Sequence, residues 1–121
     1  MTPTNPAKFL LRKVQEIAGD FPVIVTGDFN ARPSTEPYQI LTAENNDMRL
    51  TDSRLVSLYP HHGPTGTGSG FRSTGKPGAE PIDHIFIKNS INVIRHGTLS
   101  DTFNGRFPSD HMPVLTEIII E

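Results

Sequence analysis

The chain has 121 residues, of which 35% are hydrophobic and 20% charged, and its formal net charge is −2. This profile is typical of one globular unit, and its scattered basic residues argue against a protein that binds nucleic acid mainly by neutralising many phosphates. The absence of cysteine excludes disulfides and thiolate metal sites, and no apolar run approaches the roughly 20 residues needed to span a bilayer.

The first predicted element is an amphipathic helix. Asn5 is suited to cap its N-terminus and Pro6 to occupy its first position. Apolar side chains then recur at helical spacing until Gly19, which ends the helix. The helix leads directly into a strand over residues 21–29. Because this strand is apolar on both sides, we expect both of its faces to be covered.

The strand over residues 21–29 ends in polar residues. Asp28 and Asn30 are two positions apart, so in extended backbone their side chains leave the same face of the sheet. Pro33 cannot continue a strand, which places the pair at the strand's C-terminal end, a common position for chemistry in α/β proteins. The alternative is that Asp28 and Asn30 are turn residues that bond their own backbone.

A shorter second helix is expected to begin after Ser34 and Thr35. The segment 59–81 then contains six glycines and four prolines in 23 residues. Its length favours a functional surface loop, and a flexible linker is the alternative. Strands are predicted over residues 82–87, 91–97 and 112–120. Nothing in the sequence indicates a second domain.

Polar residues also stand at the ends of the later strands. Asp83 lies near the start of the strand over residues 82–87, and Asp110 and His111 directly precede the strand over residues 112–120. Each of these alone is explained by an ordinary turn or loop. Their order along the chain, after Asp28 and next to buried strands, indicates a common site.

Three short sequences carry a family resemblance: "GDFN" at 27–30, "PIDHIFI" at 81–87 and "SDHMPV" at 109–114. With them the chain resembles the endonuclease/exonuclease/phosphatase superfamily, whose members cleave phosphoester bonds with the help of a metal ion. The resemblance implies a four-layer α/β sandwich with mostly antiparallel sheets flanked by helices. It also implies that the chain is a phosphodiesterase or phosphatase.

The resemblance further implies a role for each polar residue. Asp28 would orient or deprotonate the attacking water, and Asn30 would hold that water and a phosphate oxygen. Asp83 would pair with His111, so that His111 donates a proton to a phosphate oxygen. Asp110 would bind Mg²⁺ or Mn²⁺, which prefer oxygen ligands.

The family domain is longer than this chain, and its N-terminal half supplies a metal-binding Glu and a further His. Residues 1–121 are therefore expected to form the C-terminal half of the sandwich, which needs the missing half or a second chain to cover its sheet. The chain alone is expected to be inactive. By the resemblance the substrate is expected to be a phosphoester, whether of a small molecule, a lipid headgroup or a nucleic acid. The alternative function is a non-catalytic interaction module. The compartment is open, with a cytoplasmic location expected if Met1 is the true start.

Overall fold

The structure is a computed structural model that describes residues 5–29, 31–68, 80–106 and 109–121. Its fold is α/β with antiparallel strands, as the sequence predicted. None of the helices in these described ranges is long and apolar enough to cross a membrane. The elements in chain order are α1 (Pro6–Ala18), β1 (Val23–Asp28), α2 (Glu36–Thr42), β2 (Thr51–Asp52), the 3₁₀ helix η1 (Ser53–Leu55), β3 (Asp83–Lys88), β4 (Ile91–Thr98) and β5 (Val114–Ile120).

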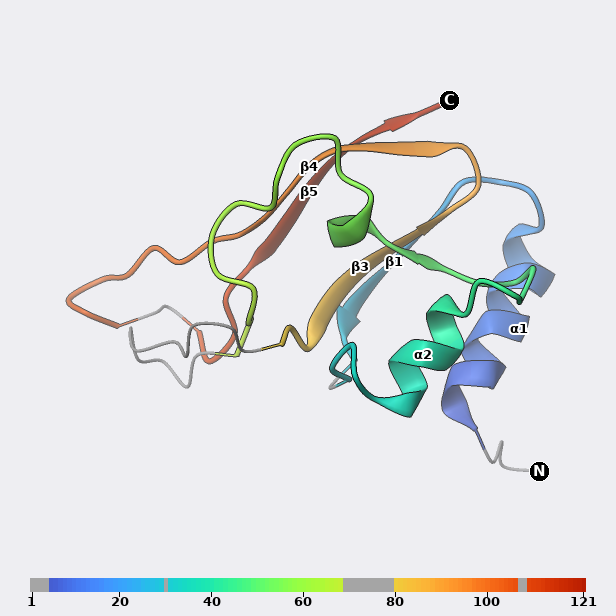
Figure 1. Ribbon diagram of the computed structural model, residues 1–121, viewed down its shortest axis with the longest axis horizontal. Coiled ribbons are helices and arrows are strands. Elements are labelled where there is room, and N and C mark those ends of the chain that lie inside the picture. The colour runs from blue at the N-terminus through green and yellow to red at the C-terminus, as the bar shows by residue number, and fades with distance from the viewer. Residues whose placement is uncertain (1–4, 30, 69–79, 107–108) are drawn as a thin grey trace.

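The strands form two separate sheets. β3 lies between β1 and β2 in a three-stranded antiparallel sheet, and β4 pairs with β5 in an antiparallel hairpin. The chain passes from one sheet to the other at Asn89 and Ser90, both of which have a positive φ. Figure 1 shows α1 and α2 side by side on one side of the three-stranded sheet, with β4 and β5 on its other side.

Helix α1 begins and ends where the sequence predicts. The Asn5 side chain accepts hydrogen bonds from the backbone N–H groups of Ala7 and Lys8, at 3.1 and 3.2 Å. These bonds satisfy donors that have no partner within the helix. At the other end Gly19 has a φ of 54° and donates its N–H to the carbonyl of Gln15. Local signals alone therefore determine both ends of α1.

The main core lies between the two helices and the three-stranded sheet. Phe86 of β3 is fully buried at its centre and packs edge-on against Phe29. The helices contribute apolar side chains from the faces that meet the sheet. The buried members of this core are Ala7, Leu11, Tyr38, Leu41, Leu50 and Phe86.

The expectation that both faces of the first strand are covered was wrong. Val25 is partly buried against the core, but Ile24, on the opposite face of β1, is 47% exposed. The reason is that α1 and α2 cover only one face of this sheet, while β4 and β5 on its other side leave Ile24 of β1 exposed (Figure 1). Strand β5 also exposes apolar side chains, Leu115 and Ile119. The chain therefore leaves apolar strand surface open to solvent.

The glycine-rich segment is bonded to the second sheet in its described part. The N–H groups of Leu58 and Tyr59 donate to carbonyls of β4, and His62 exchanges two backbone hydrogen bonds with β4, at 2.9 and 2.8 Å. Gly63 follows with a φ of +82°, where a Cβ would lie 2.1 Å from the Thr98 carbonyl oxygen. Residues 58–63 are thus an ordered part of the fold, which argues against a flexible linker at this point.

Candidate functional site

Two of the predicted site residues face each other across neighbouring strands. β1 ends at Asp28 and β3 begins at Asp83, and these two residues are direct partners in the antiparallel register. Partner residues in such a register lie on the same face of the sheet. The pairing of β1 with β3 therefore brings two carboxylates to one edge of the three-stranded sheet.

His111 reaches the same edge from the segment before β5. Its Nδ1 lies 2.7 Å from Asp83 Oδ2, and its Nε2 lies 3.7 Å from Asp28 Oδ2. The contact between Asp83 and His111 that the sequence predicts is therefore present. Because a carboxylate only accepts, Nδ1 carries the proton in this bond, and Nε2 is the ring atom turned toward Asp28.

The surroundings of His111 favour its protonated form. The hydrogen bond to Asp83 raises the pKa of His111 above its ordinary value, and the negative charges of Asp83, Asp28 and Asp110 raise it further, whereas partial burial opposes the shift. Each of these carboxylates attracts the imidazolium more strongly than the neutral ring. The surroundings thus stabilise the protonated ring of His111 relative to the neutral ring.

The three side chains lie on a cavity of about 470 Å³. A cavity of this size accommodates a small ligand. Its polar side is formed by Asp28, Asp83, Ser109 and His111, and its remaining walls include Ile85 and other apolar residues from the two sheets. A ligand in this cavity would meet the carboxylates and the imidazole together.

The other two predicted site residues are Asp110 and Asn30. Asp110 is exposed, and the Ser109 hydroxyl donates to its Oδ1 at 3.3 Å while accepting the N–H of His111 at 3.2 Å. Asn30 lies outside the described residues, so its predicted position beside Asp28 stays a prediction.

A possible metal group can be identified within the described ranges. It consists of Asp28, Asp83 and His111, each of which offers one ligand atom within 4.8 Å of the others. Asp110, the residue that the sequence predicts as the metal ligand, does not belong to this group. Its predicted role stays a prediction.

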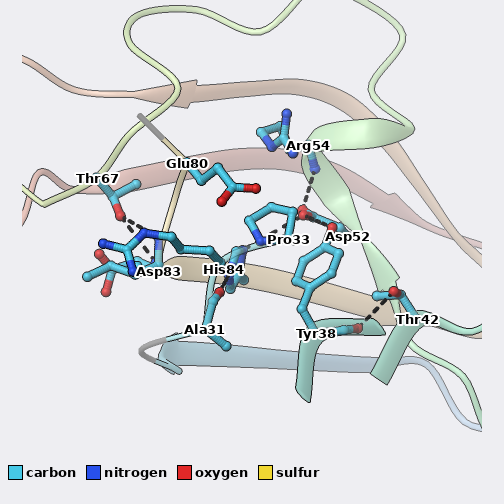
Figure 2. Close-up of polar contacts among 12 residues, drawn as sticks. Ala31, Pro33, Tyr38, Thr42, Asp52, Arg54, Thr67, Glu80, Asp83 and His84 are labelled. Carbon is cyan, nitrogen blue, oxygen red and sulfur yellow. Dashed lines mark hydrogen bonds and ion pairs between the residues drawn. The ribbon is translucent and has the colours of Figure 1, made fainter. Parts of the chain in front are cut away.

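A buried polar network lies behind the candidate site (Figure 2). His84 follows Asp83 and points to the other face of β3, where its Nε2 donates to the Ala31 carbonyl at 2.6 Å. On the same side the Tyr38 hydroxyl donates to Asp52 Oδ2 at 2.6 Å, and His84 Nδ1 lies 3.8 Å from that oxygen. His84 therefore fixes the chain just after β1, where it leaves the site.

His84 is packed inside the protein, and only 3% of it is exposed. Asp52 was missed. The Asp52 side chain also accepts the N–H of Arg54, as an Asp that opens a tight turn does. An Asp in the sequence is a local signal for such a turn. That signal predicts a turn and gives no indication of a partner as distant as Tyr38.

Comparison with known proteins identifies relatives along nearly the whole chain. A crystal structure of an endonuclease/exonuclease/phosphatase family protein from Bacteroides thetaiotaomicron superposes with a TM-score of 0.83 at 30% identity, over 95% of this chain and 44% of that one. A mannosyl-6-phosphatase from the same species gives a TM-score of 0.82 at 31% identity, over 94% of this chain and 44% of that one.

Among curated sequences, endonuclease/exonuclease/phosphatase family domain-containing protein 1 of Mus musculus is 26% identical over an alignment of 126 residues, which covers 93% of this chain and 20% of that protein. The chain thus spans less than half the length of the solved structures and about a fifth of this curated relative. Residues 5–111 match the sequence profile of the Endonuclease/Exonuclease/phosphatase family. Since this match covers most of the chain, the protein belongs to the Endonuclease/Exonuclease/phosphatase family.

Proposed function

We propose that this chain is part of a divalent-metal-dependent phosphoester hydrolase, a phosphodiesterase or phosphatase. The observation that carries the proposal is the group of Asp28, Asp83 and His111 on one cavity, with His111 hydrogen-bonded to Asp83 at 2.7 Å. The mannosyl-6-phosphatase among its structural relatives supports a phosphoester substrate. The substrate is a phosphoester of a small molecule, a lipid headgroup or a nucleic acid.

In this proposal Asp28 acts on the attacking water, and His111 acts on the negative charge that develops on the phosphate. Hydrolysis forms a bond from water oxygen to phosphorus and breaks the bond to the leaving oxygen. Asp28 orients the water and accepts its proton, and the role proposed for Asn30 is to hold that water and a phosphate oxygen. His111, held through Nδ1 by Asp83, donates from Nε2 to a non-bridging phosphate oxygen on which negative charge accumulates. The distance of 3.7 Å between Nε2 and Asp28 Oδ2 supports this arrangement, since both groups then reach one small ligand.

The donor set fits a hard divalent cation such as Mg²⁺ or Mn²⁺. These ions prefer carboxylate oxygens and water, and the site offers carboxylates and no thiolate. We assign Asp110 as a ligand, next to His111, with Asp28 and Asp83 as further carboxylates at the same edge of the sheet. When bound, the ion would polarise the phosphoryl group.

We further propose that residues 1–121 form the C-terminal half of a four-layer sandwich. Two observations support this: the chain spans 44% of the solved relatives, and β1 and β5 expose Ile24, Leu115 and Ile119. The remaining half of the domain, or a second chain in its place, would cover these side chains. It would also supply the metal ligands and substrate contacts that this chain lacks.

The proposal predicts that the completed domain hydrolyses a generic phosphoester in a metal-dependent manner. The domain would be produced from the full reading frame and assayed on bis-(4-nitrophenyl) phosphate and 4-nitrophenyl phosphate with Mg²⁺ or Mn²⁺. We expect turnover that EDTA abolishes and added metal restores. A folded, metal-loaded domain that hydrolyses no diester, monoester or lipid headgroup would contradict the proposal, and the non-catalytic interaction module would take its place.

Residues 1–121 alone are expected to bind Mg²⁺ or Mn²⁺ with a Kd on the order of millimolar or weaker. The physical reason is that few carboxylates are available and Mg²⁺ gives up its water reluctantly. Isothermal titration calorimetry of the chain measures the affinity, with Asp110→Ala as the matched variant. Micromolar binding that is lost in Asp110→Ala would mean that the site is already complete in this chain.

A further inference from the structure

Thr67 connects the two chain segments that carry Asp83 and His111. Its Oγ1 accepts the backbone N–H groups of Ile82 and Asp83, at 3.1 and 3.2 Å. Its carbonyl accepts the N–H of Met112, the residue after His111, at 2.6 Å. Thr67 is 1% exposed, so these bonds are shielded from water. One buried residue thus holds the backbone beside both members of the pair.

This connection matters because Asp83 and His111 belong to different parts of the fold. Asp83 begins β3 in the three-stranded sheet, whereas His111 precedes β5 in the hairpin. The hydrogen bond of 2.7 Å between their side chains therefore depends on how these two parts are placed relative to each other. A hydrogen bond weakens steeply when its donor–hydrogen–acceptor angle falls below about 120°.

The neighbouring residue extends the same connection. Gly68 forms an antiparallel bridge with His111, so Gly68 lies directly beside the histidine backbone. The Thr67 hydroxyl has two lone pairs, which match the two N–H groups that it receives. A residue that lacked this oxygen would leave those two N–H groups without their acceptor.

We propose that Thr67 is a positioning residue for the Asp83–His111 pair and sets the relative placement of the two backbones through its hydroxyl and carbonyl groups. It acts through Asp83 and His111 and touches no substrate. The consequence for catalysis rests on the proposed function, whereas the consequence for the hydrogen bond between Asp83 and His111 does not.

The test compares Thr67→Ser with Thr67→Ala in the completed domain, because these variants both lack the threonine methyl group and differ only in the hydroxyl. We expect Thr67→Ala to lower kcat about 10- to 100-fold with little change in KM, the scale found for groups that orient the residues of a site. Thr67→Ser is expected to retain most of the wild-type kcat. Thr67→Val, which keeps the side-chain shape, should resemble Thr67→Ala. If Thr67→Val does not fold, the comparison of Thr67→Ser with Thr67→Ala decides the question.

Thr98→Val serves as the matched control. Thr98 is also 1% exposed, and its Oγ1 lies 3.3 Å from His61 Nε2, in a contact that involves neither Asp83 nor His111. We expect it to lower the unfolding midpoint while leaving kcat unchanged. If Thr67→Ala loses stability like Thr98→Val and keeps its kcat, Thr67 is only a structural residue and the proposal is wrong.

A second measurement does not require activity. The Nδ1 proton of His111, bonded to Asp83, should give a downfield proton NMR signal that disappears in His111→Ala. We expect this signal to persist in Thr67→Ser and to weaken or shift upfield in Thr67→Ala. An unchanged signal in folded Thr67→Ala would overturn the positioning role. If the signal depends on Thr67 in this way but the wild-type domain hydrolyses no phosphoester, the positioning role holds and the proposed function fails.

Discussion

Replacing His111 with alanine in the completed domain is expected to lower kcat about 10²-fold or more, the effect of deleting one donor to the transition state. The variant loses both the Nε2 proton donor and the partner of Asp83, whose carboxylate is then left partly buried without its hydrogen bond. Steady-state kinetics on bis-(4-nitrophenyl) phosphate with saturating metal measures the effect. The change should be in kcat rather than KM, because the donated hydrogen bond strengthens as charge develops on the phosphate.

Asp28→Asn should be at least as harmful as His111→Ala. It preserves the shape of the side chain and removes its ability to accept a proton. The matched control is His62→Ala, since His62 is an exposed histidine whose backbone hydrogen bonds to β4 do not depend on its side chain. We expect His62→Ala to keep the wild-type kcat. A His111→Ala protein with an unchanged rate would remove His111 from the mechanism and leave the enzyme hypothesis without its main support.

The second large effect concerns stability. Asp52→Ala is expected to lower the free energy of unfolding by about 3 to 5 kcal/mol, since buried donors left unpaired cost about 1 to 3 kcal/mol each. Asp52 is 2% exposed and accepts the Tyr38 hydroxyl at 2.6 Å and the Arg54 N–H at 3.0 Å. Both donors would lose their acceptor inside the protein, and a cavity would remain where the carboxylate was.

Urea unfolding followed by circular dichroism measures this difference. Tyr38→Phe is the matched variant, because it removes only the hydroxyl, leaves Asp52 bonded to Arg54 N–H, and should lower the free energy of unfolding by about 1 kcal/mol. Equal losses in the two variants would show that the bond between Tyr38 and Asp52 is the only contribution of Asp52 to stability.

Local sequence signals predicted some parts of this fold well. Asn5, Pro6 and Gly19 determine the ends of α1 through bonds to residues at most four positions away, so the sequence is sufficient. The contact between Asp83 and His111 came from the family resemblance. Spacing alone could not have predicted it, because 28 positions separate the two residues.

Other parts depended on pairing between distant segments. The split into two sheets, the bond from Tyr38 to Asp52 and the connection made by Thr67 leave no local pattern, since each joins segments that approach only in the folded chain. Strand β1 illustrates the same limit. Its continuous apolar run indicates that Ile24 is suited to burial, but such a run does not tell which chain provides the cover.

The place of β1 in its sheet has a consequence for handling the protein. Within the described residues β1 is an outer strand of the order β1-β3-β2, and Ile24 is exposed on one of its faces. Outer strands with apolar faces can add a strand from another molecule, which leads to aggregation. Covering by its proper partner and stacking onto a second copy therefore compete for this surface. When the partner is joined in the same polypeptide, dilution slows the stacking between copies but does not slow covering by the partner. Synthesis as one chain therefore protects the sheet.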